Sequence, residues 1–441
     1  MKVRKEITEL LNAGIITPEI AERINDYYNK KSGSPQNKVV IVFGILGALL
    51  VSLGIILILA SNWEGLSRSL KTVIAFIPLL IGQFCCGYSL IRKEDNVAWR
   101  EASSTFLIIA IGASISLISQ IYNISGRFDT FLLTWIILSF PLIYIMRSSC
   151  ASLMYIILIT WFGCIGYIDN TESYLYWGLL LLALPYYILF KHERGGNFFT
   201  FHNWFIPLSV IIVLGTVARD AEPLMLIAYV SLLGLLYQIG NIPLLRDEKI
   251  RNNGYLVLGS LGTVVILLGL SFDFFWSELR DDQFWTNEFL KSPEFIAAAI
   301  LSIAALVLFL MHKKNQRPFE LKPVEPVFIL FIIIWMIGLT SPMAIVFVNL
   351  LVLGIGVMTI REGAKLYHLG ILNYGLLIVT ALVICRFFDT DLGFIFKGLL
   401  FVGVGFGFFY ANYHMVKKKK AVSGNIPPAP DSIPQNYIER S

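Results

Sequence analysis

Residues 39–60 read VVIVFGILGALLVSLGIILILA and contain no charged side chain. About 20 consecutive apolar residues are enough for an α-helix to cross the hydrocarbon core of a bilayer, so this run predicts a transmembrane helix. The mostly polar residues 1–38 precede it. Because the run is too long for the core of a signal peptide, we expect the N-terminal segment to stay attached.

Similar apolar runs recur along almost the whole chain of 441 residues. Hydrophobic residues make up 56% of the sequence and charged residues 15%, against about a quarter charged in a soluble domain. This composition excludes an ordinary soluble globular protein. It predicts an all-α, polytopic integral membrane helix bundle of about 14 transmembrane helices (about 12–14, because several runs are short). The expected spans are 39–60, 72–91, 104–122, 130–146, 150–168, 173–190, 204–218, 223–244, 254–275, 295–311, 324–340, 342–360, 366–384 and 391–411.

The loop charges predict the orientation, because lysine and arginine are in excess in cytoplasmic loops. With the N-terminus in the cytoplasm, the cytoplasmic loops hold about 15 of these residues and the outer loops about 7. The N-terminal segment is basic, and Lys417–Lys420 follow the last span. Both termini are therefore expected in the cytoplasm, which requires an even number of spans.

Two cytoplasmic segments flank the predicted bundle at residues 39–411. Residues 1–38 read as a short helical hairpin and linker, in which Thr17 and Pro18 begin the second helix. That helix is not basic, so we expect no nucleic-acid partner and interpret the hairpin as a structural module or a docking site for a protein partner. Residues 412–441 are basic and contain several prolines, which is typical of a disordered tail.

Sequence motifs for catalysis and metal binding are missing. The five cysteines lack the spacing of a metal site, and the chain contains no nucleophile elbow, phosphate-binding loop or HExxH motif. We therefore predict no catalytic residue, no metal and no cofactor. An intramembrane enzyme remains an alternative if carboxylates or histidines from distant spans converge at one interface.

Charged side chains at membrane depth are costly, so each one needs an explanation. Lys397 lies about six residues into the last span, roughly 9 Å from its outer end. It could line a path for an ion, or its long stem could extend outward so that the ammonium pairs with a nearby carboxylate. The candidate polar pathway or charge network comprises Lys397, Arg386, Asp389, Asp391 and Asp273, with Gln120 and Tyr122 ending the third span on the same side.

Neutral polar residues nearer mid-span have a simpler interpretation. Gln238 and Asn349, like Gln83 and Asn373, are expected to join helices by hydrogen bonds. The glycines of Gly259–Gly269 match those of Gly44–Gly54, which indicates either a parallel internal repeat or close helix packing through small residues.

The largest outer loop is acidic and aromatic. We expect its Trp276, Phe284 and Trp285 to lie at the membrane interface as an aromatic belt, with a ligand lid as the alternative.

Three stretches carry a resemblance to a known family: LLNAGIITPEIAERINDYY at residues 10–28, ILASNWEGLSRSLK at residues 58–71 and IGASISLISQIYNISGRFD at residues 111–129. Over residues 8–147 the chain resembles an uncharacterised bacterial family of membrane proteins, domain of unknown function 2157. The resemblance implies a multi-pass protein of the bacterial cytoplasmic (inner) membrane. It implies no activity, substrate or catalytic residue.

Three functions remain open at this stage. The first is a non-enzymatic protein that moves a small solute or lipid across the bilayer through its helix bundle. The second is a membrane scaffold or sensor that docks a partner through the N-terminal hairpin. The third is an intramembrane enzyme acting on a lipid-linked substrate.

Overall fold

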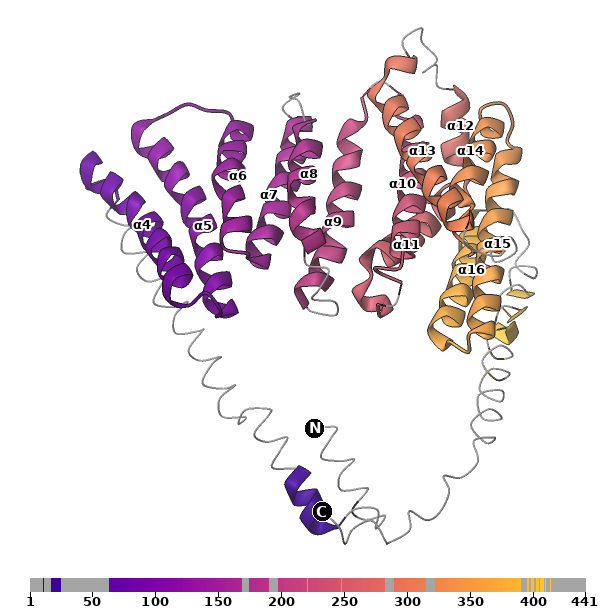
Figure 1. Ribbon diagram of the computed structural model, residues 1–441. Helices are drawn as coiled ribbons and strands as arrows, with labels where there is room; N and C mark the ends of the chain where they lie inside the picture. Colours follow the sequence, from indigo (N-terminus) through magenta and orange to yellow (C-terminus); the bar gives the residue numbers. More distant parts are fainter. Residues whose placement is uncertain are drawn as a thin grey trace. The chain divides into compact units, whose positions relative to one another are not determined.

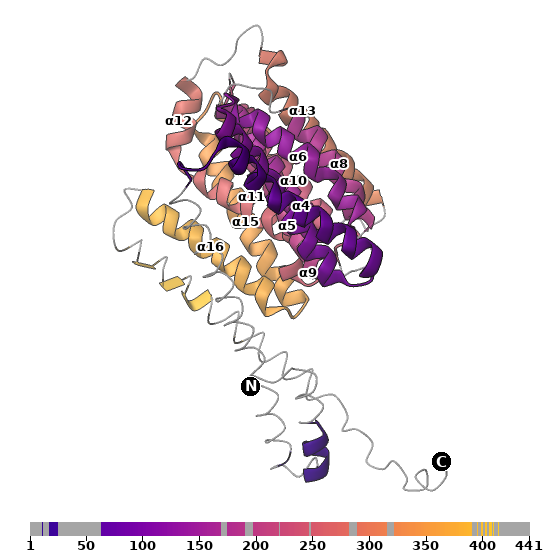
Figure 2. The ribbon, with the colours of Figure 1, turned by 90° about the vertical axis from the view of Figure 1, so that its left-hand side faces the viewer.

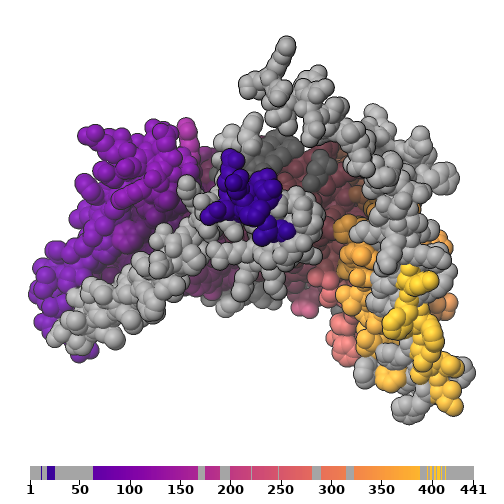
Figure 3. All heavy atoms as spheres, turned by 90° about the horizontal axis from the view of Figure 1, so that it is seen from below, coloured from indigo at the N-terminus to yellow at the C-terminus, as the bar shows by residue number. Residues whose placement is uncertain are grey.

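The structure, a computed structural model, describes residues 63–168, 174–189, 197–219, 221–246, 248–281, 289–314 and 322–389, together with residues 17–24 and isolated positions at 11 and between 395 and 413. These are the coloured parts of Figure 3.

Within these ranges the chain forms α-helices joined by turns and short 3₁₀ segments, and no strand (Figure 1). The helices are α4 (Arg68–Arg92), α5 (Val97–Tyr122), α6 (Phe128–Ile145), α7 (Ser149–Ile168), α8 (Leu175–Leu189), α9 (Asn197–Leu214), α10 (Leu224–Gly240), α11 (Gly254–Gly269), α12 (Asp273–Asp281), α13 (Pro293–Lys314), α14 (Val327–Gly338), α15 (Met343–Lys365) and α16 (Leu369–Asp389).

Helices occupy the position of every predicted span from 72–91 to 366–384. In the described part of the chain, eight helices are long and apolar enough to cross a membrane, namely α4, α5, α6, α7, α9, α13, α15 and α16. Helices α8, α10 and α14 are apolar but shorter. The prediction of a helical membrane bundle is therefore confirmed. The predicted first span lies outside the described residues, and so does most of the predicted last span.

The described part of the N-terminal segment contains the start of its predicted second helix. Residues 18–24 are helical, and Thr17 Oγ1 accepts a hydrogen bond from the backbone N–H of Ile20 at 3.4 Å. The predicted helix cap is therefore present. The rest of the hairpin, and the tail at residues 412–441 apart from Tyr413, lie outside the described residues.

The chain divides into two compact units, one of Met1–Ile77 with Leu117–Ile124 and one of Pro78–Ser116 with Ser125–Ser441. In the first unit, the hydroxyls of Thr72 and Tyr122 lie 3.1 Å apart. The second unit contains helices α6 to α16 and the apolar cores described below.

Helix α10 lies at the centre of the larger apolar core in the second unit. It contacts α9, α11, α13 and α14, and 13 of its 17 residues are buried. A helix that is apolar all round is typical of a bundle interior, because no face needs contact with water or headgroups. A smaller core joins α6, α7 and α8 around Leu132, Tyr155 and Tyr176. Helices α15 and α16 pack side by side (Figures 1 and 2).

Two glycines of α11 allow this helix to pack closely against α10. A Cβ added to Gly259 would lie 2.5 Å from the backbone nitrogen of Tyr237, and one on Gly262 would lie 2.6 Å from the Leu233 side chain. These glycines of α11 therefore admit α10, which favours close packing as the explanation of the Gly259–Gly269 pattern.

The predicted span at residues 254–275 is wrong in one respect, because it is not a single straight helix. The chain bends by 73° between α11 and α12. Side chains take two carbonyls at the end of α11: Ser271 Oγ donates to Leu268 O at 2.6 Å, and Trp276 Nε1 donates to Leu270 O at 2.7 Å. These bonds satisfy carbonyls that a continuing helix would use, so the helix ends there.

The interface-belt prediction for Trp276 is also wrong. Its side chain is 0% exposed, and its ring lies against Gly338 of α14. The neighbouring Phe274 is 70% exposed. The predicted belt residues Phe284 and Trp285 lie outside the described residues.

Candidate functional site

The structure brings Arg386, a residue of the predicted charge network, to the bend between α11 and α12. Arg386 lies near the end of α16, and its Nη2 donates to Ser271 Oγ at 3.2 Å. Its guanidinium also lies over the ring of Phe272, 5.0 Å from the ring centroid. A charge in this position is held by a hydroxyl and an aromatic face, so it remains at the bend instead of turning away from it.

A third polar side chain joins this place from α15. Asn349 Nδ2 donates to Ile345 O at 2.7 Å and lies 3.4 Å from Ser271 O. We call Ser271, Asn349 and Arg386 the bend cluster. Asn349 therefore connects α15 to the bend that follows α11, in the way predicted for a mid-span amide.

The structure describes the surroundings of three other residues of the predicted network. Asp273 forms an ion pair with Arg280 of its own helix at 3.0 Å. Gln120 and Tyr122 are exposed residues of the first unit, and the Tyr122 hydroxyl lies beside that of Thr72. Asp391, Lys397 and the side chain of Asp389 lie outside the described residues, so the proposed pairing of Lys397 stays a prediction.

A second polar group, which sequence analysis missed, lies where α10, α13 and α15 end and α14 begins. Lys313 Nζ and Glu325 Oε2 form an ion pair of 3.0 Å, and Glu325 is only 2% exposed. The backbone N–H of Lys322 donates to the same carboxylate oxygen at 3.3 Å, while its ammonium donates to Asn241 Oδ1. We call Asn241, Lys313, Lys322, Glu325 and Glu362 the charge cluster.

Electrostatics ties Glu362 of α15 to this group. Burial lowers the pKa of the Lys322 ammonium below its ordinary value of 10.5, the carboxylates of Glu325 and Glu362 oppose that effect, and Arg246 and Lys313 add to it. The two carboxylates therefore favour the charged form of Lys322, and Glu325 is also ion-paired with Lys313. Pairing of this kind offsets the cost of burying a charge.

The two clusters share one helix, α15, and lie near its opposite ends. Asn349 and Glu362 are 13 residues apart on α15, and Ser271 follows Ser260 of α11 by 11 residues. Ser260 hydrogen-bonds to Tyr374 of α16 at 3.0 Å, 12 residues before Arg386. At 1.5 Å per residue these separations are roughly 16–20 Å. Helices α11, α15 and α16 contact one another, so one packed group of helices carries polar side chains at two levels.

Two signals in the sequence could have identified the charge cluster. Lys313 and Lys322 are among the basic residues that predict the orientation of the chain. Glu325 falls inside the predicted span 324–340. A carboxylate at the start of a span, three and twelve residues after two lysines, is a recognisable pattern.

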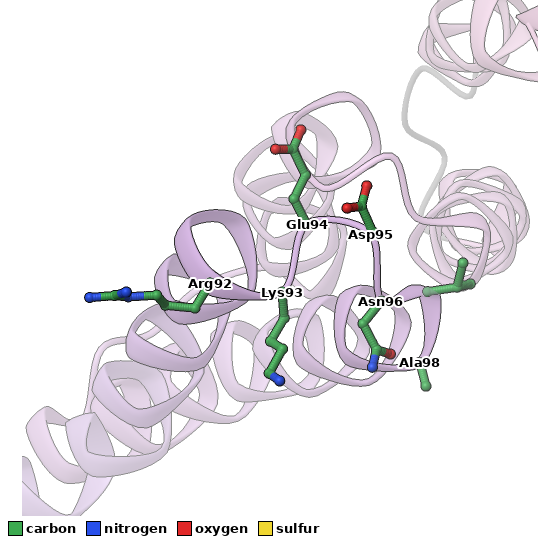
Figure 4. A pocket seen from close by; sticks show the side chains of 7 residues that line it. Arg92, Lys93, Glu94, Asp95, Asn96 and Ala98 are labelled. Atoms are coloured by element: carbon green, nitrogen blue, oxygen red, sulfur yellow. The ribbon is translucent and has the colours of Figure 1, made fainter.

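A surface hollow at the turn between α4 and α5 is not a binding site. It is lined by the consecutive residues 92–98. In Figure 4 the side chains of Arg92, Lys93 and Glu94 point away from one another. A ligand there would meet no convergent group. Among the described residues, no set of three or more His, Cys, Asp and Glu side chains is placed to hold a metal ion.

One buried pair deserves comparison with an enzyme site. Ser152 Oγ and His202 Nε2 lie 2.9 Å apart and join α7 to α9. A serine beside a histidine base can act as a nucleophile, but acyl transfer also needs N–H donors for the oxyanion. The N–H groups of residues 149–151 are already bonded to Glu101 and Ser148. We interpret the pair as a helix-packing contact, and it lends no support to the intramembrane enzyme.

Comparison with known families gives one match. Residues 8–152 match the family described as Predicted membrane protein (DUF2157). The resemblance stated above is confirmed over these residues. The DUF2157 match includes α4, α5, α6 and the first residues of α7, so the bend cluster and the charge cluster both lie beyond it. No curated protein and no solved structure matches the chain.

Proposed function

We propose that this protein moves a small solute or a lipid across the bilayer along a path bordered by α10, α11, α14, α15 and α16, which are connected by mutual contacts. The observation that carries the proposal is the pair of polar clusters near opposite ends of α15, which contacts α11, α14 and α16. A discontinuous helix with polar side chains at its break is a feature that transporters use to bind substrates, because the freed backbone groups can face a solute. The bend after α11 and the bend cluster fit that pattern.

The topology forms part of the proposal. We propose about 14 spans, with both termini in the cytoplasm of a bacterial cell and the bundle in its cytoplasmic membrane. The charge cluster then faces the cytoplasm and α12 faces outward. In a variant without its native cysteines, Asp281→Cys should react with a membrane-impermeant thiol reagent in intact cells. If the cysteine at position 281 reacts only after the cells are made permeable to the reagent, the proposed orientation is wrong.

Flux measurements on vesicles test the transport proposal. The purified protein is reconstituted, and entry of glycerol, urea, lactate and phosphate is followed by light scattering, while lipid movement is followed with a headgroup-labelled phospholipid. We expect at least one probe to move faster than in protein-free vesicles. Arg386→Gln and Glu362→Gln should each lower that flux about tenfold, a change of about 1.4 kcal/mol in the barrier.

The matched control is Gln83→Leu, because Gln83 is an exposed residue of α4 outside both clusters. It should leave the flux unchanged. If none of the probes moves faster than in protein-free vesicles, or if both cluster variants carry the probe as well as the unmodified protein, the proposed path is wrong.

The scaffold or sensor is the alternative, and one observation favours it. Ile20 is an apolar side chain, 46% exposed, on the short helix that Thr17 caps. An exposed apolar residue on a helix of the N-terminal segment suits a docking contact. Deleting residues 1–31 separates the two functions. A transporter keeps its flux after the deletion, whereas a scaffold loses its bound partner in a detergent pull-down.

A further inference from the structure

Gln238 of α10 is a buried amide that the clusters above do not include. Its side chain is 0% exposed, and neither Oε1 nor Nε2 has a hydrogen-bond partner among the described residues. The expectation that Gln238 joins two helices by a hydrogen bond is therefore not met. Leaving both ends of a buried amide unpaired opposes folding, so its presence calls for a functional explanation.

The position of Gln238 on α10 places it one turn from the charge cluster. It precedes Asn241 by three residues and follows Gly234 by four, so all three lie on one face of the helix. Gly234 lies against Phe328 of α14, and Asn241 accepts a hydrogen bond from the Lys322 ammonium. Seven residues before Gln238, Ser231 hydrogen-bonds to Ser302 of α13 at 2.8 Å. The amide therefore lies on the face of α10 that packs against α13 and α14.

Two contacts of the charge cluster join the helix ends next to this amide. The Lys313–Glu325 ion pair connects the end of α13 to the residue pair before α14, and the Lys322–Asn241 hydrogen bond connects the same segment to the end of α10. We call these two contacts the latch. Both use partly or fully buried groups, so breaking them exposes charges that water then solvates.

We propose that Gln238 contacts the transported molecule and that the latch controls access to it from the charge-cluster end. The inference rests on the proposed function and assigns one residue of its path. It also assigns a chemical class. A carboxamide carries no charge and both donates and accepts, while the charges nearby are already paired with one another. The molecule therefore presents an uncharged hydrogen-bonding group, such as a hydroxyl or an amide, to Gln238.

Thiol accessibility tests the latch without knowledge of the molecule transported. Gln238→Cys is made in the full chain after the five native cysteines are replaced, and its reaction with methyl methanethiosulfonate is followed by mass spectrometry. We expect slow reaction with the latch intact. Adding Glu325→Gln and Asn241→Ala should speed it about tenfold, because local opening becomes more frequent.

The matched control is Ala228→Cys, a buried position on the same helix whose reaction should not change when the latch is broken. If the thiol at position 238 reacts equally fast with and without the latch, or stays unreactive in both, access to Gln238 is not controlled there. This readout is independent of flux. Vesicles without flux but with latch-dependent labelling would contradict the proposed function and the contact with a transported molecule, and would support the latch alone.

Thermal unfolding tests whether the Gln238 amide lowers the stability of the protein while it serves transport. Gln238→Leu removes two unpaired polar atoms from the buried interior, so the variant should melt at a higher temperature than the unmodified protein. Melting is measured in detergent by tryptophan fluorescence. The variant should also lose flux of uncharged probes such as glycerol about tenfold. Asn349→Leu, which removes two hydrogen bonds that Nδ2 donates and one unpaired oxygen, should melt at a lower temperature. A lower melting temperature for Gln238→Leu would mean that the amide is paired in the folded protein, and it would overturn the proposal.

Discussion

At the scale of single residues, Glu101 of α5 has a structural role at the start of α7. Its carboxylate accepts hydrogen bonds from Ser148 Oγ at 2.6 Å and from the backbone N–H groups of Ser149 and Cys150 at 2.9 and 2.8 Å. It therefore caps the start of α7 from α5, and its negative charge faces the positive end of that helix.

Removing that cap should be costly. Glu101→Ala leaves three donors without an acceptor, and we expect a loss of about 2–4 kcal/mol in the free energy of unfolding. The exposed Glu94, seven residues earlier, provides the control, since Glu94→Ala should leave stability unchanged. Denaturant unfolding in detergent measures both variants. Equal stability of the two would show that the cap is not needed.

Lys322 makes stability depend on pH in the alkaline range. Burial lowers its pKa in the folded protein below 10.5, the value expected when the chain is unfolded. Between the two values the unfolded chain binds more protons, so the contribution of Lys322 to stability rises with pH across that window. Lys322→Met should remove this rise. As the pH increases toward 10.5, the melting temperature of the wild type should therefore rise relative to that of Lys322→Met.

The control for that measurement is Lys93→Met, at an exposed turn. Its gap from wild type should stay constant over the same pH range. A constant gap for Lys322→Met as well would mean that the ammonium is not buried in the folded protein.

At the scale of elements, the bend between α11 and α12 depends on a close contact with α14. A Cβ on Gly338 would overlap the buried ring of Trp276. We therefore expect Gly338→Ala to lower the free energy of unfolding by about 1–3 kcal/mol through overpacking. Gly354→Ala on α15 is the matched control, because no atom lies within 4 Å of its added Cβ. Adding Trp276→Leu should recover part of the loss only if the ring causes it.

Sequence analysis located the elements well where a single physical rule decides them. The span expected at 130–146 corresponds to Phe128–Ile145, because length and hydropathy alone determine a lipid-facing helix. The bend at residues 270–272 was not predictable in this way. The local sequence is apolar enough to continue a helix, and the carbonyls that end it are taken by Ser271 and by a tryptophan four residues beyond the bend.

The same distinction applies to the candidate site. Arg386 was predicted from its position to belong to a charge network beside the last span, but its partner Ser271 lies 115 residues away in the chain. The Lys313–Glu325 pair and the unpaired amide of Gln238 depend on which helices pack together, and that order is not encoded in any local pattern. A charge or amide can therefore be marked as unusual from sequence, whereas its role requires the packing.

At the scale of the whole molecule, the family match and the candidate site occupy different parts of the chain. The match ends at residue 152, and the two polar clusters fall between Asn241 and Arg386. A function that all members of the family share should reside in the first third of this chain, where the match lies. The proposed transport path would then belong to the helices after residue 152. Variants in those helices are expected to lose flux, whereas variants within residues 8–152 are expected to lose the function that the family shares.

The length of α14 has a consequence for the surrounding lipid. This helix has 12 residues, about 18 Å at 1.5 Å per residue, whereas the hydrocarbon layer is about 30 Å thick. Its Leu330, Ile333 and Met336 side chains are exposed, so lipid acyl chains would contact a short apolar surface there. With the spans proposed above, the bilayer must become thinner beside α14. The protein should consequently unfold at a higher temperature in vesicles of short-chain phospholipids than in long-chain ones, and would act on its membrane by deforming it as well as by crossing it.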